Sequence, residues 1–143
     1  MRKILLILAS AIILGASALN VEKRIYEEVL RAIFPEKRIV KVWSDSKNMK
    51  RAVSTIRWVH TVSDPDKADI LLVNNPETLK KIKEGKLIIF VGSYTLLKEH
   101  QDMAIGGFFW QKGRPNLVFI KRNIERFDIK LPKKFEDYVE DRV

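Results

Sequence analysis

Few residues of this sequence are of the types that carry out chemistry. Cysteine is absent and there are two histidines, His60 and His100. Thiol nucleophiles, disulfides and metal sites built on cysteine or on several histidines are therefore excluded. The segment Asp64–Asp69 resembles a calcium loop only superficially, because Pro65 interrupts it and no glutamate closes it. We predict no catalytic residues, no metal and no cofactor.

Polar residues follow three predicted strands, at Ser44-Asp45-Ser46, Asn74-Asn75-Pro76 and Gly92-Ser93-Tyr94. In an open parallel sheet, ligands bind outside the carboxyl ends of the strands, where helix N-termini present N–H groups to anions. Helix capping alone also accounts for these residue types. The alternative site, for an anionic solute, consists of Ser44, Asn74, Asn75, Ser93 and Tyr94. An enzyme would need Asp45, Ser93 and one histidine to converge in one pocket.

The most distinctive stretch is the segment Ala104–Pro115, in which two glycines precede three aromatic residues. Paired glycines in a strand mark a bulge or the close approach of a second backbone. Alternation places Phe108 and Trp110 on one face and Phe109 on the other, so an exposed Trp110 implies an exposed Phe108. Aromatic residues beside cations are typical of a protein interface, although the same residues also suit a hairpin core. The predicted partner-binding residues are Gly106, Gly107, Phe108, Trp110, Lys112, Arg114, Lys121 and Arg122.

These residues must be positioned by strands and helices that alternate along the chain. An amphipathic helix is predicted over Val21–Phe34, ending at Pro35. The apolar runs Ala68–Val73 and Leu87–Val91 are continuous, as in parallel strands buried on both faces. The other predicted elements are strands over Arg38–Trp43, Thr55–Val62 and Ile129–Leu131, short helices over Lys47–Val53, Glu77–Lys83, Tyr94–Glu99, Asn123–Phe127 and Lys133–Val139, and a hairpin over Met103–Lys121.

The predicted fold is a three-layer α/β domain with a mainly parallel sheet and helices on both faces. The antiparallel hairpin is expected at one edge of this sheet, where unpaired backbone groups can accept a further strand.

Residues 1–18 have the three parts of a cleavable signal peptide: a basic start, the apolar run Ile4–Leu14 and small residues at Ala16-Ser17-Ala18. The apolar run is shorter than the roughly 20 residues that span a bilayer. We therefore expect a periplasmic protein consisting of one domain over Leu19–Val143. Removal of Arg2 and Lys3 lowers its formal net charge from +9 to +7.

The basic charge is concentrated between Lys112 and Lys134, where eight basic residues accompany two acidic ones. In a cytosolic protein this pattern would suggest nucleic acid, but an exported protein is not expected to bind it. We expect an acidic partner domain or an anionic membrane surface instead. A merely solvated basic face is the third reading, and nothing in the sequence specifies an oligomeric state.

The order of these features resembles the YfiR-like family of small periplasmic proteins, most closely from Ala68 onward. The resemblance rests on Phe34-Pro35 after the first helix, the strand Ala68–Val73, the strand and turn Leu87–Ser93, the Gly106-Gly107 strand, and Ile129-Lys130-Leu131 before the last helix. Three family features are missing or reduced. The cysteines with a redox role are absent, and the arginine and asparagine of the family's strand after the hairpin turn are not matched, since Leu117 and Phe119 keep only the apolar alternation. The aromatic-rich segment after the first helix is reduced to Phe34-Pro35. The resemblance implies a non-enzymatic regulator that binds the outer domain of an inner-membrane signalling protein, typically a diguanylate cyclase.

Overall fold

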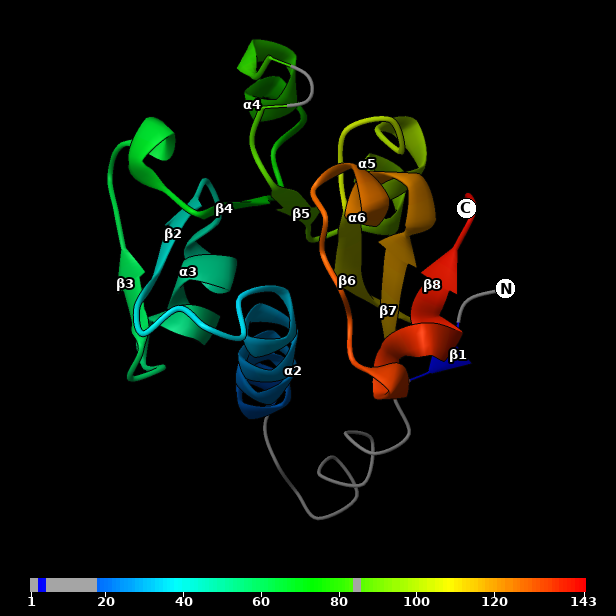
Figure 1. Ribbon diagram of the computed structural model, residues 1–143, viewed down its shortest axis with the longest axis horizontal. Helices are drawn as coiled ribbons and strands as arrows, with labels where there is room; N and C mark the ends of the chain where they lie inside the picture. Colours follow the sequence, from blue (N-terminus) through cyan, green and yellow to red (C-terminus); the bar gives the residue numbers. More distant parts are fainter. Residues whose placement is uncertain (1–2, 5–17, 84–85) are drawn as a thin grey trace.

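The computed structural model describes residues 3–4, 18–83 and 86–143. Most of the predicted signal peptide lies outside these residues. Its predicted cleavage point coincides with the first described helix, because Ala18 is the first residue of that helix. Figure 1 shows one twisted sheet flanked by helices, with β3 at one end and β1 and β8 at the other.

The described strands form a single sheet in the order β1-β7-β6-β5-β4-β2-β3, with β8 also paired to β7. The strands are β1 (Lys3–Ile4), β2 (Val40–Ser44), β3 (Val59–Thr61), β4 (Ile70–Val73), β5 (Ile89–Val91), β6 (Gly106–Gln111), β7 (Arg114–Ile120) and β8 (Val139–Glu140). All neighbours from β3 to β6 are parallel, whereas β7 is antiparallel to β6 and to β1. The mainly parallel sheet with an antiparallel hairpin is therefore confirmed.

Helices cover both faces of this sheet, which gives the three predicted layers. The first face carries α2 (Ala18–Ile33), α3 (Lys47–Ser54), α6 (Lys121–Arg126) and the 3₁₀ helix η2 (Lys133–Tyr138); the second carries α4 (Pro76–Lys81) and α5 (Tyr94–Glu99). The parallel strands β3-β2-β4-β5-β6 have the doubly wound order 2-1-3-4-5 in chain sequence. The strand order therefore changes direction between β2 and β4.

Two predicted strands differ from the structure. The segment Thr55–Val62 is reduced to β3, because Ile56 and Val59 take part in turns through bonds to the carbonyls of Val53 and Ile56. The segment Ile129–Leu131 pairs with no described strand. The strand that pairs with β7 after the hairpin is β8, which follows η2 (Lys133–Tyr138) where the sequence predicted only a helix.

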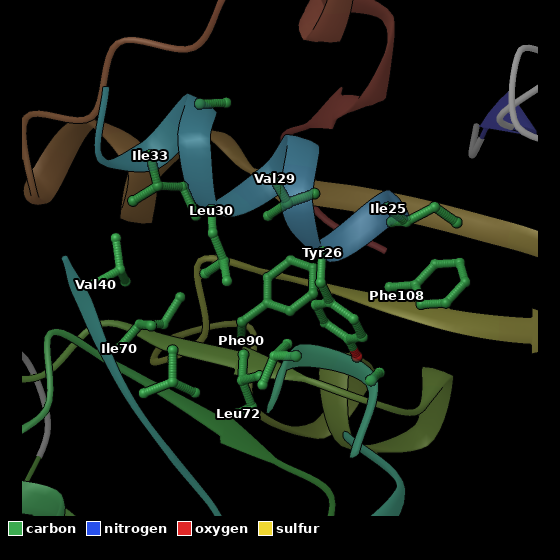
Figure 2. Close-up of a cluster of buried hydrophobic side chains, with 14 of the residues drawn as sticks. Ile25, Tyr26, Val29, Leu30, Ile33, Val40, Ile70, Leu72, Phe90 and Phe108 are labelled. Atoms are coloured by element: carbon green, nitrogen blue, oxygen red, sulfur yellow. The ribbon is translucent and has the colours of Figure 1, made fainter. Parts of the chain in front are cut away.

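The larger core lies between α2 and the sheet, and Tyr26 stands at its centre (Figure 2). The Tyr26 ring meets Phe90 and Phe108 edge-on, at centroid distances of 6.1 and 5.9 Å. The predicted helical stripe of Val21, Ile25, Val29 and Ile33 is buried beside it. The second core joins α4 and α5 to the other face, so that Leu71 and Val73 point away from Ile70 and Leu72.

The hydroxyl group of Tyr26 lies in this apolar setting, with 2% of the residue exposed. It has no hydrogen bond to any residue that the structure describes. Burial, and secondarily the carboxylate of Glu22, raise the pKa of the Tyr26 phenol well above its ordinary value. The phenol is therefore protonated in the folded protein, and a buried hydroxyl without a partner opposes folding.

We expect Tyr26→Phe to raise the free energy of unfolding by about 1 kcal/mol, because the ring contacts remain and the substitution removes a buried hydroxyl that has no partner among the described residues. Tyr26→Leu loses both ring contacts and serves as the destabilised comparison. Above about pH 10 the unfolded chain releases the phenolic proton and the folded chain keeps it, so wild-type stability falls there more than that of Tyr26→Phe. Urea unfolding across pH measures both effects, and a clear loss of stability in Tyr26→Phe near neutral pH would contradict this account.

Candidate functional site

The carboxyl ends of β2 and β4 form the point at which doubly wound domains bind ligands. Asp45, which directly follows β2, joins the two strand ends. Its carboxylate accepts the backbone N–H groups of Asn74 and Asn75, at 2.8 and 3.1 Å. The chain's own carboxylate therefore occupies the backbone N–H groups that an anion would need there.

The other polar residues at the strand ends are engaged in a similar way. Ser93 Oγ accepts the Leu96 N–H and caps α5 at 3.2 Å, while Asn75 Oδ1 accepts the Glu77 N–H and caps α4 at 3.0 Å. Ser44 Oγ accepts the N–H of Ser46 at 3.1 Å. The capping interpretation thus accounts for Asn75 and Ser93, whereas Ser44 closes a turn in front of Ser46, the N-cap of α3. Of the remaining two predicted ligand residues, Asn74 is exposed and Tyr94 packs its ring against Phe109 at 5.8 Å.

A groove of about 650 Å³ lies beside these strand ends, on the α4 side of the sheet. Its walls come from the end of β2, from the 3₁₀ helix η1 (Pro65–Lys67), from α4 and the residues that follow it, and from the segment before β5. The lining residues are Trp43, Pro65, Asp66, Asn75, Glu77, Thr78, Lys81, Ile82, Lys83, Lys86 and Leu87. Only Asn75 belongs to the predicted ligand set. The sequence carries no signal for a ligand role of Trp43, because a tryptophan near the end of an apolar strand is equally typical of a strand that only packs in the sheet.

The residues that an enzyme would need do not converge. His60 is exposed on β3, the edge strand, and Ser93 follows β5, three strand spacings or about 14 Å away across the sheet. His100 ends α5, so the length of that helix separates it from Ser93 at the other end. Within the described ranges no three His, Cys, Asp or Glu side chains lie close enough to hold a metal ion.

The predicted partner-binding surface is wrong for Gly106, Gly107 and Phe108, which are buried inside the sheet. A Cβ atom on Gly106 would collide with the carbonyl oxygen of Val118, and one on Gly107 would lie 2.9 Å from that of Val91. Both glycines are therefore explained by the close approach of neighbouring strands, which was the structural alternative. Phe108 and Trp110 do share one face, as alternation predicts, but Phe108 is 3% exposed.

Trp110 is half-buried and has a structural partner. Its indole Nε1–H donates to Oε1 of Glu22 at 3.0 Å, and its ring contacts Phe108 at 6.0 Å. The hydrogen bond ties the end of β6 to the first turns of α2, across 88 residues of chain. Trp110 is thus an anchor between two elements of the domain, which corrects its placement on a free surface.

The four predicted cations are exposed but do not form one patch. Lys112 and Gly113 occupy the two-residue hairpin turn with φ of 51° and 75°, the left-handed values of a type I′ turn. Arg114 starts β7, whereas Lys121 and Arg122 start α6 after β7 ends, roughly 23 Å away at the usual rise of a strand. None of the four forms an ion pair with a residue that the structure describes.

Comparisons with known proteins leave the family open. No protein-family model matches the chain, and no curated protein matches its sequence. The relation to the YfiR-like family therefore remains a prediction from the sequence features given above. Among the described helices, none is both long enough and apolar enough to cross a membrane.

We expect Asp45→Ala to lower the free energy of unfolding by about 2 kcal/mol, because two N–H groups lose a charged acceptor at once. Asp64→Ala is the matched control, since its carboxylate accepts one N–H within its own turn, from Asp66 at 3.0 Å. Urea unfolding gives both values. Equal losses in the two variants would show that Asp45 does not hold the ends of β2 and β4 together.

Proposed function

We propose that this chain is a non-enzymatic periplasmic regulator that binds the outer domain of an inner-membrane signalling protein of the diguanylate-cyclase type. The observation that supports it most directly is the hairpin turn, where Lys112 and Arg114 are exposed and lack ion-pair partners among the described residues. Such charges attract an acidic surface and accelerate its encounter.

The hairpin presents these cations on a rigid support. All six residues of β6 pair with β7, from Gly106 opposite Phe119 to Gln111 opposite Arg114. The bond from Trp110 to Glu22 holds the turn end of β6 against α2. Binding at this turn therefore loses little conformational entropy, apart from that of the Lys112 and Arg114 side chains themselves.

The proposed contact surface is smaller than the one predicted from the sequence. It keeps Lys112 and Arg114, and it excludes the buried residues Gly106, Gly107 and Phe108. Lys121 and Arg122 lie at the other end of β7 and form a second basic site. That second site is suited to an anionic membrane surface or to a different part of a large partner.

A second candidate function is the binding of a small anionic solute in the groove beside Trp43. The groove supports it because a half-buried indole offers an apolar stacking face, and because the three lysines of the lining, Lys81, Lys83 and Lys86, outnumber its two carboxylates, Asp66 and Glu77. A planar aromatic carboxylate or phosphate has the matching chemistry. Its site differs from the strand-end residues Ser44, Asn74, Ser93 and Tyr94.

The partner proposal is tested by crosslinking in the native cells and identification of the captured proteins. We expect the wild type to recover an inner-membrane signalling protein, and Lys112→Glu with Arg114→Glu to reduce its recovery about tenfold, as for loss of a steering charge pair. Lys50→Glu with Arg51→Glu is the control, because it makes the same charge change on exposed residues of α3. Equal recovery with both double variants would place the interface elsewhere.

The solute proposal is tested by thermal-shift screening of aromatic carboxylates and phosphates. A ligand of this site raises the melting temperature saturably in the wild type and not in Trp43→Ala, because the stacking face is gone. Trp58→Ala removes another half-buried indole outside the groove and should leave the shift intact. Two results would refute this function: a ligand that shifts the melting temperature of Trp43→Ala as much as that of the wild type, or a screen in which no aromatic carboxylate or phosphate shifts the wild type.

A further inference from the structure

Two short strands share the outer side of β7, the side that faces away from β6 (Figure 1). β1 runs antiparallel to the first half of β7, with Lys3 opposite Leu117 and Ile4 opposite Asn116. β8 runs parallel to the second half, with Val139 opposite Phe119. The predicted free edge of the hairpin is therefore covered in the full chain, by a different strand along each half.

Backbone alternation identifies the groups that depend on β1. The Ile120 N–H donates to the Ile105 carbonyl at 2.8 Å, so Ile120 faces the β6 side of the sheet. Val118 and Asn116 then face β6 as well, whereas Leu117 and Phe119 direct their N–H and C=O groups outward. Pro115 holds the next outward position and has no N–H, which is typical of a sheet edge. The backbone of Leu117 is therefore the part of β7 that faces β1.

β1 lies within the segment predicted to be removed as the signal peptide. The two described core clusters consist of residues that all follow residue 18, from Val21 to Phe135. The mature domain should therefore fold without residues 1–18 and present the outward N–H and C=O of Leu117 without a strand partner. Open edges of this kind add a strand from another chain.

We infer that removal of residues 1–18 opens β7 at Leu117, and that an extended acidic segment of the protein partner replaces β1 there, antiparallel to β7. This inference rests on the proposed function and names how the partner is recognised. In the full chain β1 already pairs with this edge of β7, so the precursor cannot accept the partner's strand and only the processed protein binds it.

Three features favour an acidic segment of the partner as the strand that replaces β1. The pairing with β1 shows that an antiparallel strand fits beside Leu117 and Asn116. A strand in that register continues past Pro115 toward Arg114 and the turn residue Lys112, both exposed cations, so acidic side chains are favoured at its far end. A second copy of the chain is disfavoured, because the mature protein carries a net charge of about +7 and copies repel each other.

Hydrogen exchange at single amides tests the opening of the edge. We expect the Leu117 amide to exchange about tenfold faster, or more, in a chain that starts at Leu19 than in the full chain. Lys3→Pro in the full chain is the matched variant, because it removes the N–H that pairs with the Leu117 carbonyl, weakens the two-residue pairing of β1 and keeps the chain length; it should therefore also speed exchange at Leu117. The Val118 amide, which faces β6, should stay protected in all three proteins. Equal protection of Leu117 with and without residues 1–18 would overturn the inference, as would an intact mass showing that the exported protein keeps them.

Strand addition is tested with a short synthetic peptide that alternates valine with glutamate, and with a counterpart that alternates valine with lysine. The acidic peptide should restore protection of Leu117 in the chain that starts at Leu19, more strongly than the basic one, and should have no effect on the full chain. Failure of the acidic peptide to protect Leu117 at saturation overturns the inference. Protection without peptide that disappears on dilution assigns the edge to a second copy, which also overturns it.

The same measurement separates this inference from the proposed function. If crosslinking recovers a signalling protein but Leu117 stays unprotected in that complex, the partner is bound without strand addition and this inference alone fails. If no membrane protein is recovered while the acidic peptide protects Leu117, the edge accepts a strand and the proposed function alone fails.

Discussion

Burial of the parallel strands on both faces is the constraint on which the rest of the domain depends. β4 is buried at all four residues, and β5 at all three. Such strands have no polar side of their own, so the hydrogen-bonding residues of this half of the sheet stand at the strand ends and begin the helices. Asp45, Asn75 and Ser93 illustrate this, because each satisfies backbone N–H groups where one element gives way to the next. The surfaces left for recognition are the edges of the sheet and the groove beside it.

The parallel half of the fold could be predicted because its signals are local. The continuous apolar runs Ala68–Val73 and Leu87–Val91 became β4 and β5, and the caps at Ser46, Asn75 and Ser93 begin the helices expected there. The secondary structure after Asn123 was harder to predict from the sequence. β8 is two residues long and exists because Val139 lies beside Phe119, a contact between distant segments that no local pattern encodes.

The candidate interface could not be predicted from local sequence either, because it also depends on which distant segments come together. The composition of Phe108-Phe109-Trp110 suits an interface and a core equally well, and alternation assigned the faces correctly without saying which face is covered. What covers Trp110 is Glu22, 88 residues earlier in the chain. The cations were easier to recognise as exposed, because lysine and arginine are rarely buried in a core without a partner, but the length of β7 separates them into two sites.

The position of β8 also has a consequence for the order of events during biosynthesis. The sheet is completed at its β7 edge by residues Val139–Glu140, and Gln101 is tied to the last residue by bonds of 2.9 and 3.2 Å to the backbone of Val143. These contacts form only after residues 139–143 have been synthesised, later than the strands β2 to β7. Sheets assembled from such distant pairings fold slowly. A chain that completes its sheet last keeps its β7 edge open longest during synthesis, and an open edge can pair with another strand in that interval.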